Sequence, residues 1–149
     1  MAVTASGLFI PTFRDVLDAS QLAIDFDAEN HKCAMFTDSI TPNFSTDTAY
    51  GSAPYNANEV SGTGYTAGGA AVTGTTLTES PTGSLMWDAN DVSWASSTIP
   101  NCRCCLIYAD AVADQAILLV NFGGDYASNA GTFLIQWAAT GMFAWDLTP

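Results

Sequence analysis

Basic residues are scarce in this sequence. Lys and Arg number 3 in 149 residues against 15 acidic residues, which gives a formal net charge of −12. A protein that binds nucleic acid neutralises phosphates with clustered Lys and Arg side chains. Three scattered cations, Arg14, Lys32 and Arg103, do not build such a surface or one that binds an anionic membrane. We therefore expect neither nucleic acid nor membrane as a partner.

We expect neither a secretory signal nor an extracellular disulfide framework in this sequence. No basic region precedes the short apolar patch at the N-terminus, and Pro11 follows that patch directly. The four cysteines are poorly spread for a disulfide framework, because three of them fall in "CRCC": Cys33, Cys102, Cys104 and Cys105. We expect reduced thiols that pack as small hydrophobic residues, in a protein assembled in the cytoplasm.

Charge is low overall, while apolar residues are common. Apolar residues make up 48% of the chain and charged residues 12%. This composition excludes general disorder, and the length fits a single domain over residues 1–149. Because so little charge is unusual for a lone soluble monomer, we expect part of the surface to contact other subunits.

Short apolar or alternating runs between turn residues dominate the chain. Helical spacing appears once, in "PTFRDVLDASQ" after Pro11. Strands are expected near 22–26, 32–36, 71–78, 84–87, 102–109, 116–122, 132–137 and 142–145. The pattern predicts a mainly β fold, a single-domain antiparallel β-sandwich or jelly-roll-like barrel with one short N-terminal helix.

Three segments allow more detailed predictions. "AILLVNF" is apolar at nearly every position, which predicts a strand covered on both faces. "TFLIQWA" places Phe133, Ile135 and Trp137 on one face, which predicts a half-buried strand. The segment from Ser39 to Gly69 contains no convincing strand, and a loop of that length usually has a function or lies against a partner.

The stretch "NEVSGTGYTAGGAAVTG" is the most distinctive glycine-rich element. Its glycines do not follow the dinucleotide-binding spacing, and it has no P-loop lysine. Close glycines instead permit tight backbone approach where a chain reverses direction. We expect a loop shaped by six residues: Glu59, Gly62, Gly64, Tyr65, Gly68 and Gly69. Tyr65 would anchor it by burying its ring, and Glu59 would accept glycine amides or pair with a cation on a neighbouring subunit.

Two groups of residues have metal-ligand chemistry. Asp25, Asp27 and Glu29 alternate along one side of an extended chain, but the EF-hand glycine and glutamate are absent, so a solvated acidic strand end is favoured over calcium. "HKC" and "CRC" would each present two zinc ligands on one strand face, although one-residue spacing is poor for a tetrahedral metal. With a single histidine, His31, and no nucleophile elbow, nothing nominates a catalytic set, a cofactor or a metal.

The chain resembles a family of small virion structural proteins of tailed bacteriophages. The resemblance rests on "KCAMFTDSITPNFSTDTAY", the Glu-Val-x-Gly-x-Gly-Tyr-x-x-Gly-Gly element from Glu59 to Gly69, "WASSTI" leading into "LIYAD", and "LLVNFGGDYASNAGTFLIQWAATGMFAW". These segments span most of the chain in the same order. "CRCC" departs from the pattern, where ordinary strand residues are expected.

The resemblance implies a non-enzymatic building block without catalytic residues. We expect a decoration or cement protein on the capsid exterior of the virion, with the major capsid protein and other copies of itself, as a homotrimer, for partners. A tail or head-to-tail connector component is an alternative. A host-adsorption module is another, in which exposed tryptophans stack on a saccharide; the candidates are Trp87, Trp94, Trp137 and Trp145.

Overall fold

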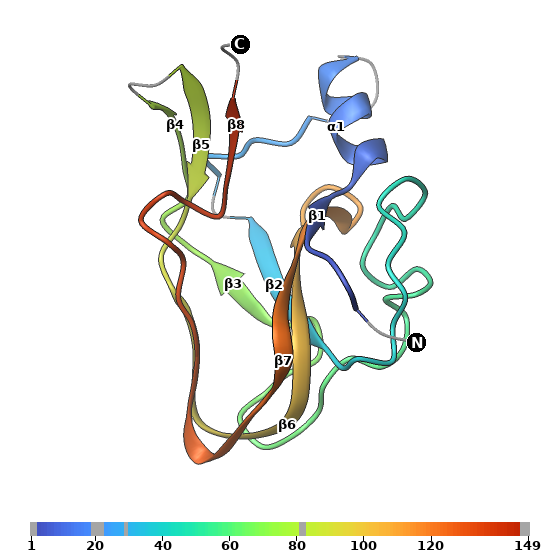
Figure 1. Ribbon diagram of the computed structural model, residues 1–149, viewed down its shortest axis with the longest axis vertical. Helices are drawn as coiled ribbons and strands as arrows, with labels where there is room; N and C mark the ends of the chain where they lie inside the picture. Colours follow the sequence, from blue (N-terminus) through green and yellow to red (C-terminus); the bar gives the residue numbers. More distant parts are fainter. Residues whose placement is uncertain (1–2, 19–22, 29, 81–82, 147–149) are drawn as a thin grey trace.

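The computed structural model describes residues 3–18, 23–28, 30–80 and 83–146 and shows a mainly β protein with two antiparallel sheets and one short helix (Figure 1). The larger sheet has the strand order β1 (Gly7–Leu8), β7 (Gln115–Ile135), β6 (Val92–Ala109), β2 (His31–Phe36) and β3 (Ala70–Val72). The smaller sheet has the order β4 (Thr76–Ser80), β5 (Ser84–Asp88) and β8 (Phe143–Asp146). Helix α1 (Ile10–Leu17) follows β1.

Strands β6 and β7 form one long hairpin that folds back on itself. Their pairing runs from Ala109 with Gln115 at the tip to Val92 with Ile135 at the open end. Several register shifts interrupt the ladder between Trp94 and Cys104, and such bulges bend a ribbon. Figure 1 shows the ribbon descending, turning and rising again. We call residues 102–109 with 115–126 the sheet arm, and residues 92–99 with 128–135 the outer arm.

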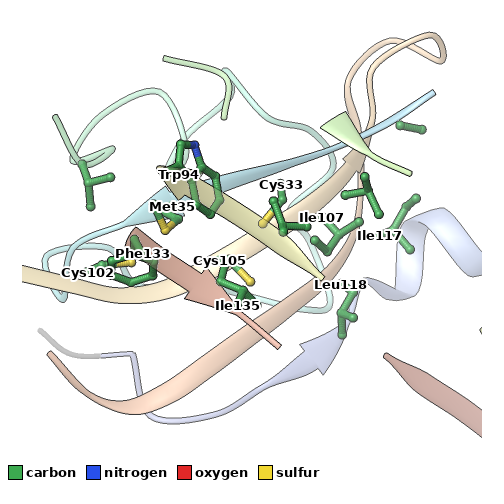
Figure 2. Close-up of a cluster of buried hydrophobic side chains, with 14 of the residues drawn as sticks. Cys33, Met35, Trp94, Cys102, Cys105, Ile107, Ile117, Leu118, Phe133 and Ile135 are labelled. Carbon is green, nitrogen blue, oxygen red and sulfur yellow. The ribbon is translucent and has the colours of Figure 1, made fainter. Parts of the chain in front are cut away.

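The first hydrophobic core lies between these two arms. Figure 2 shows Trp94 and Phe133 of the outer arm on the same side as Met35 of β2 and Cys105 of the sheet arm. All four side chains are buried in one cluster, which Trp87 of β5 also joins. The folded hairpin therefore supplies both layers of a sandwich-like arrangement, with the smaller sheet extending it.

The second core lies on the opposite face of the larger sheet. Alternate residues of β2 and β6 divide between the two faces: Cys33 and Met35 join the first cluster, while Ala34, Phe36 and Leu106 join the second. Because both faces of this sheet are covered, its central strands are apolar at almost every position. The prediction for "AILLVNF" is confirmed for residues 116–119, which are all buried, whereas residues 120–122 are only partly buried.

The expected strands at 116–122 and 132–137 are parts of one strand, so the predicted break between them is wrong. Gly123, Gly124 and Asn129 lie between the two apolar runs. The ladder instead continues past them through the bend, with Cys102 opposite Tyr126 and Ser97 opposite Gly131. The half-buried character of "TFLIQWA" is confirmed, because Phe133 and Ile135 are buried and Leu134 is 54% exposed.

Two further element predictions need correction. The expected strand at 71–78 is two strands in different sheets, because the chain turns at Gly74, whose φ is +63°. A strand was expected at 22–26, but residues 23–26 form no strand. Leu22 lies outside the described residues. There the Asp25 carboxylate accepts the Asp27 backbone N–H at 3.0 Å, which favours a turn.

Helix α1 ends at Leu17, and no helix among the described residues is long and apolar enough to cross a membrane.

Candidate functional site

Side chains of residues 40–55 in the segment from residue 37 to residue 69 cover the second face of the larger sheet, whereas Val60 and Tyr65 pack with the first core. The segment contains no strand, as predicted, and Figure 1 shows it as loops beside β2 and β6. Three of its side chains, Ile40, Tyr50 and Tyr55, pack against the second core, and Ile40 and Tyr55 are fully buried there. Burial of these side chains holds an irregular backbone in one place.

The glycine-rich loop begins and ends on the edge of β2. The Val60 backbone N–H donates to the Met35 carbonyl at 2.9 Å, and Ala70 pairs with Cys33 two residues further along β2. Between these anchor points the chain leaves β2 and contacts β6, where the Thr98 N–H donates to the Thr63 carbonyl at 2.9 Å. The loop therefore spans two neighbouring strands of the larger sheet.

Glu59 is the centre of a hydrogen-bond network that closes this loop. Its Oε1 accepts the Tyr65 hydroxyl at 2.6 Å and the Gly68 backbone N–H at 2.8 Å, and its Oε2 accepts the Tyr50 hydroxyl at 2.9 Å. The Tyr65 hydroxyl in turn accepts the Met35 backbone N–H at 2.9 Å. The hydroxyl thus gives the Met35 N–H the acceptor that a neighbouring strand would otherwise supply, at the point where the loop has left β2.

Two stacked tyrosines extend the network to the far side of Gly68. The rings of Tyr50 and Tyr108 lie parallel, with centroids 4.6 Å apart. The Tyr108 hydroxyl donates to the Gly68 carbonyl at 2.8 Å, while the Gly68 N–H binds Glu59. Gly68 is therefore held at both its donor and its acceptor, and the loop is joined to β6 by side chains as well as by backbone.

The tyrosines of the network keep their protons at neutral pH. Burial, followed by the hydrogen bond to Glu59, raises the pKa of Tyr50 to about 12. The same two causes raise the pKa of Tyr65 well above its ordinary value, and burial raises the pKa of Tyr108. Each hydroxyl therefore acts as a fixed hydrogen-bond donor, and the chemistry of the arrangement is to hold the backbone.

The glycines allow close backbone contacts that a side chain would block. A Cβ built on Gly69 would lie 1.8 Å from the Cys33 carbonyl oxygen, and one built on Gly62 would lie 1.9 Å from the Thr98 carbonyl oxygen. Gly64 lies against Ser97, where a Cβ would come within 3.0 Å of the Ser97 Cα. These three contacts fix the loop against β2 and β6.

The structure brings the six sequence-predicted residues together in one loop. Glu59, Tyr65 and Gly68 bond directly, and Glu59 adopts the first of its two predicted roles by accepting a glycine amide. The prediction that Tyr65 buries its ring with the hydroxyl at a polar group is confirmed by its contacts with Trp94 and Glu59. Sequence reasoning missed Tyr50 and Tyr108, because nothing in their spacing relates them to Glu59.

The predicted metal-ligand groups are dispersed. The Asp27 carboxylate accepts the Leu77 backbone N–H, and Glu29 lies outside the described residues. His31 pairs with Ala109 at one end of β2, whereas Cys104 pairs with Phe36 at the other end. No group of His, Cys, Asp and Glu suited to a metal ion occurs among the residues that the structure describes.

The expectation that "CRC" presents both cysteines on one strand face is wrong. Cys102 and Cys105 lie in the first core and Cys104 in the second, because a register shift between Cys102 and Cys104 moves the alternation by one residue. All four cysteines are free and fully buried, as expected for small core hydrophobes. Burial raises the pKa of the Cys102 and Cys104 thiols, which makes them poor nucleophiles.

The tryptophans divide between core and surface. Trp87 and Trp94 are buried, and the Trp87 indole N–H donates to the Phe26 carbonyl at 2.7 Å. Trp137 and Trp145 are partly exposed. Core packing therefore accounts for two of the four candidate stacking platforms.

Comparison with known protein families, curated proteins and solved structures finds no match to this chain.

Proposed function

We propose that this chain is a non-enzymatic structural protein of a tailed bacteriophage virion, a decoration protein that binds and stabilises the outer surface of the capsid. One observation carries the proposal. The network of Glu59, Tyr65 and Gly68 fixes a long irregular segment against a stiff sheet. Such a segment is a preformed contact surface, which loses little conformational entropy when it meets another subunit.

The distribution of charge supports a place outside the packaged DNA. Each of the three cations pairs with a carboxylate of the same chain: Arg14 with Asp15, Lys32 with Asp110, and Arg103 with Asp38 and Asp125. The uncompensated charge is therefore negative, which opposes contact with phosphates. The proposed partners are the major capsid protein and further copies of this chain, as a homotrimer.

Repetition over a lattice provides the mechanism of stabilisation. A single contact through the segment from residue 37 to residue 69 can be weak. When many copies make that contact on one shell, the combined effect on particle stability is large. A tail or head-to-tail connector protein would use the same rigid segment in a ring or a tube, so the number of copies per particle separates these roles.

The test is the copy number of this protein in purified virions, measured by quantitative mass spectrometry against the major capsid protein. We expect a ratio of the same order as the capsid protein. A few copies per particle would indicate a connector or tail component instead. Absence from particles would overturn the structural role altogether.

A variant pair tests whether the loop forms the contact. Gly64→Val adds a side chain against Ser97, while Gly123→Val, outside this segment, adds one where nothing lies within 4 Å of the Cβ position; the two glycines have φ values of +80° and +77°. We expect Gly64→Val to be incorporated into particles less than Gly123→Val when both melt above the assembly temperature. Equal incorporation would contradict the proposed role of the loop.

A saccharide-binding adsorption module is the second candidate, favoured by the partly exposed Trp137, which lines the same surface groove as Tyr126. Glycan-array binding by the purified protein, lost in Trp137→Ala, would support it. Against it, the Trp137 indole N–H is already bonded to the Asn90 carbonyl at 3.1 Å, which leaves the groove fewer donors for sugar hydroxyls.

A further inference from the structure

An apolar groove of about 630 Å³ opens along β7 between the two arms of the folded hairpin. None of its lining residues is charged: Val120, Phe122, Tyr126, Ala127, Thr132, Phe133, Leu134, Ile135, Gln136, Trp137, Ala138, Gly141 and Met142. In a chain with a net charge of −12, this is a surface that another acidic protein can approach without direct charge repulsion.

The groove lies where the sandwich is open. Among the described residues, β1 pairs with β7 only at Leu118 and Leu119, and no strand pairs with that edge beyond them. Val120 and Phe122 are only partly buried there, although both pack against the first core. Tyr126 and Leu134 are each 54% exposed. The groove therefore presents the side of the hydrophobic core to solvent.

Helix α1 carries an apolar stripe on its outer face. Ile10 is 57% exposed and Leu17 is 78% exposed, and the two are seven residues apart, which places them on one side of a helix. Arg14 lies between them on the same side and is also exposed. The stripe, defined as Ile10, Arg14 and Leu17, runs roughly 10 Å along the helix.

We propose that the α1 stripe of one copy of this chain docks in the β7 groove of a second copy. The large hydrophobic side chains that are exposed among the described residues divide equally between the two surfaces: Ile10 and Leu17 on the stripe, and Tyr126 and Leu134 at the groove. Helix-in-groove contacts of this kind use apolar anchors about one and two turns apart.

Charge complementarity supports the same pairing. Asp91 is exposed and accepts the backbone N–H of Trp137, a groove residue, at 3.0 Å, so a carboxylate borders the neutral groove. Arg14 brings a guanidinium between the two apolar anchors, and its only salt bridge among the described residues is to the adjacent Asp15. A docked stripe would place this cation at the acidic rim.

The contact joins two different surfaces, so each copy donates a helix and accepts one. Head-to-tail contacts of this type generate a closed ring, the arrangement that a homotrimer needs, when the rotation between copies closes, and an open filament when it does not. The inference deepens the proposed function, on which it rests for the expectation that copies assemble with one another. It names the surfaces through which they do so.

The experiment uses two full-length variants, Leu17→Glu on the stripe and Leu134→Glu in the groove, studied by sedimentation up to about 1 mM protein. Wild type is expected to self-associate, and each variant is expected to weaken association by about 30-fold or more. When the two variants are mixed, they should form a one-to-one dimer, because one retains an intact groove and the other an intact helix. Ala71→Glu, at an exposed position on β3 at the opposite edge of the larger sheet, is the control and should associate like wild type.

Three results would overturn the inference. If wild type stays monomeric at every concentration, the proposed contact does not form. Loss of association in Leu134→Glu but not in Leu17→Glu would indicate edge-to-edge pairing of β7 instead. Failure of the mixed variants to pair, with both folded by circular dichroism, would exclude the head-to-tail geometry. Self-association as proposed, with the protein absent from virions, would refute the virion role and leave this contact intact.

Discussion

The Tyr65 hydroxyl donates to Glu59 Oε1 at 2.6 Å and thereby ties the outermost part of the glycine-rich loop to the chain that enters it. The oxygen of this Tyr65 hydroxyl also accepts the Met35 backbone N–H at 2.9 Å. One hydroxyl therefore satisfies a carboxylate and a strand amide together. The loop cannot move away from β2 without leaving both groups unpaired, so its position follows from ordinary hydrogen-bond energetics.

Replacing Tyr65 with Phe should destabilise the fold by about 3 kcal/mol, because the change leaves a Met35 amide without its acceptor and removes a charge-assisted bond to Glu59. Urea unfolding measures the loss. Tyr126→Phe is the matched control, since that tyrosine is 54% exposed, and it should change the free energy of unfolding by less than about 0.5 kcal/mol. Equal effects of the two changes would mean that the network contributes nothing to stability.

The close approach of Gly69 to β2 gives a second prediction. Gly69→Ala should cost more than about 3 kcal/mol, because its Cβ would lie 1.8 Å from the Cys33 carbonyl oxygen and β3 would have to separate from β2. Gly123→Ala has a similar φ, +77° against +76°, but no atom within 4 Å of the new Cβ. Gly123→Ala should lower the free energy of unfolding by only roughly 1 kcal/mol, because an alanine at this positive φ is strained. Thermal melts of both variants distinguish crowding from strain.

Much of the fold was predictable because strand and turn residues act locally. The alternation in "TFLIQWA" and the continuous apolar run in "AILLVNF" gave the correct burial of Phe133, Ile135 and residues 116–119, although residues 120–122 are only partly buried. The continuity of β7 was not predictable, because Gly123 and Gly124 are compatible with both a chain reversal and a bent strand. Only the pairing with β6, far away in sequence, decides between them.

The candidate site was predictable in part for the same reason. Glu59, Tyr65 and Gly68 lie within ten residues of one another, so their contact could be inferred from one short segment. Tyr108 reaches Gly68 across 40 residues and depends on the strand order of the sheet. The face of each cysteine in "CRCC" depends on a bulge, which periodicity cannot place.

The buried cysteines lead to a third prediction. Because all four thiols are fully buried, a thiol reagent should modify none of them rapidly in the native protein and all of them in denaturant. Ser93→Cys, which adds a thiol at an exposed position of the outer arm, should be modified at once. Mass spectrometry of timed samples counts the modified sites. Fast modification of Cys102 or Cys105 in the native state would show that the first core opens readily.

The environment of the single histidine leads to the last prediction. His31 is 1% exposed, its Nε2 bonds the Asp25 carbonyl at 3.1 Å, and its ring lies edge-on to Trp87 with centroids 5.1 Å apart. Its Nδ1 is buried without a hydrogen-bond partner among the described residues. Burial lowers the pKa of His31 below its ordinary value of 6.5, and the hydrogen bond to the Asp25 carbonyl only partly opposes this.

Stability should therefore fall as the pH drops below 6.5, because the unfolded chain then binds a proton that the native ring does not accept. The slope should stay below the one-proton limit of about 1.4 kcal/mol per pH unit and vanish well above pH 6.5. Urea unfolding between pH 5 and 6.5 isolates this effect from most carboxylates, which titrate at about pH 4. His31→Gln retains an N–H donor for the Asp25 carbonyl but does not titrate, so it should be less stable at pH 7 and lose the slope. A slope that persists in His31→Gln would assign the pH dependence to other groups.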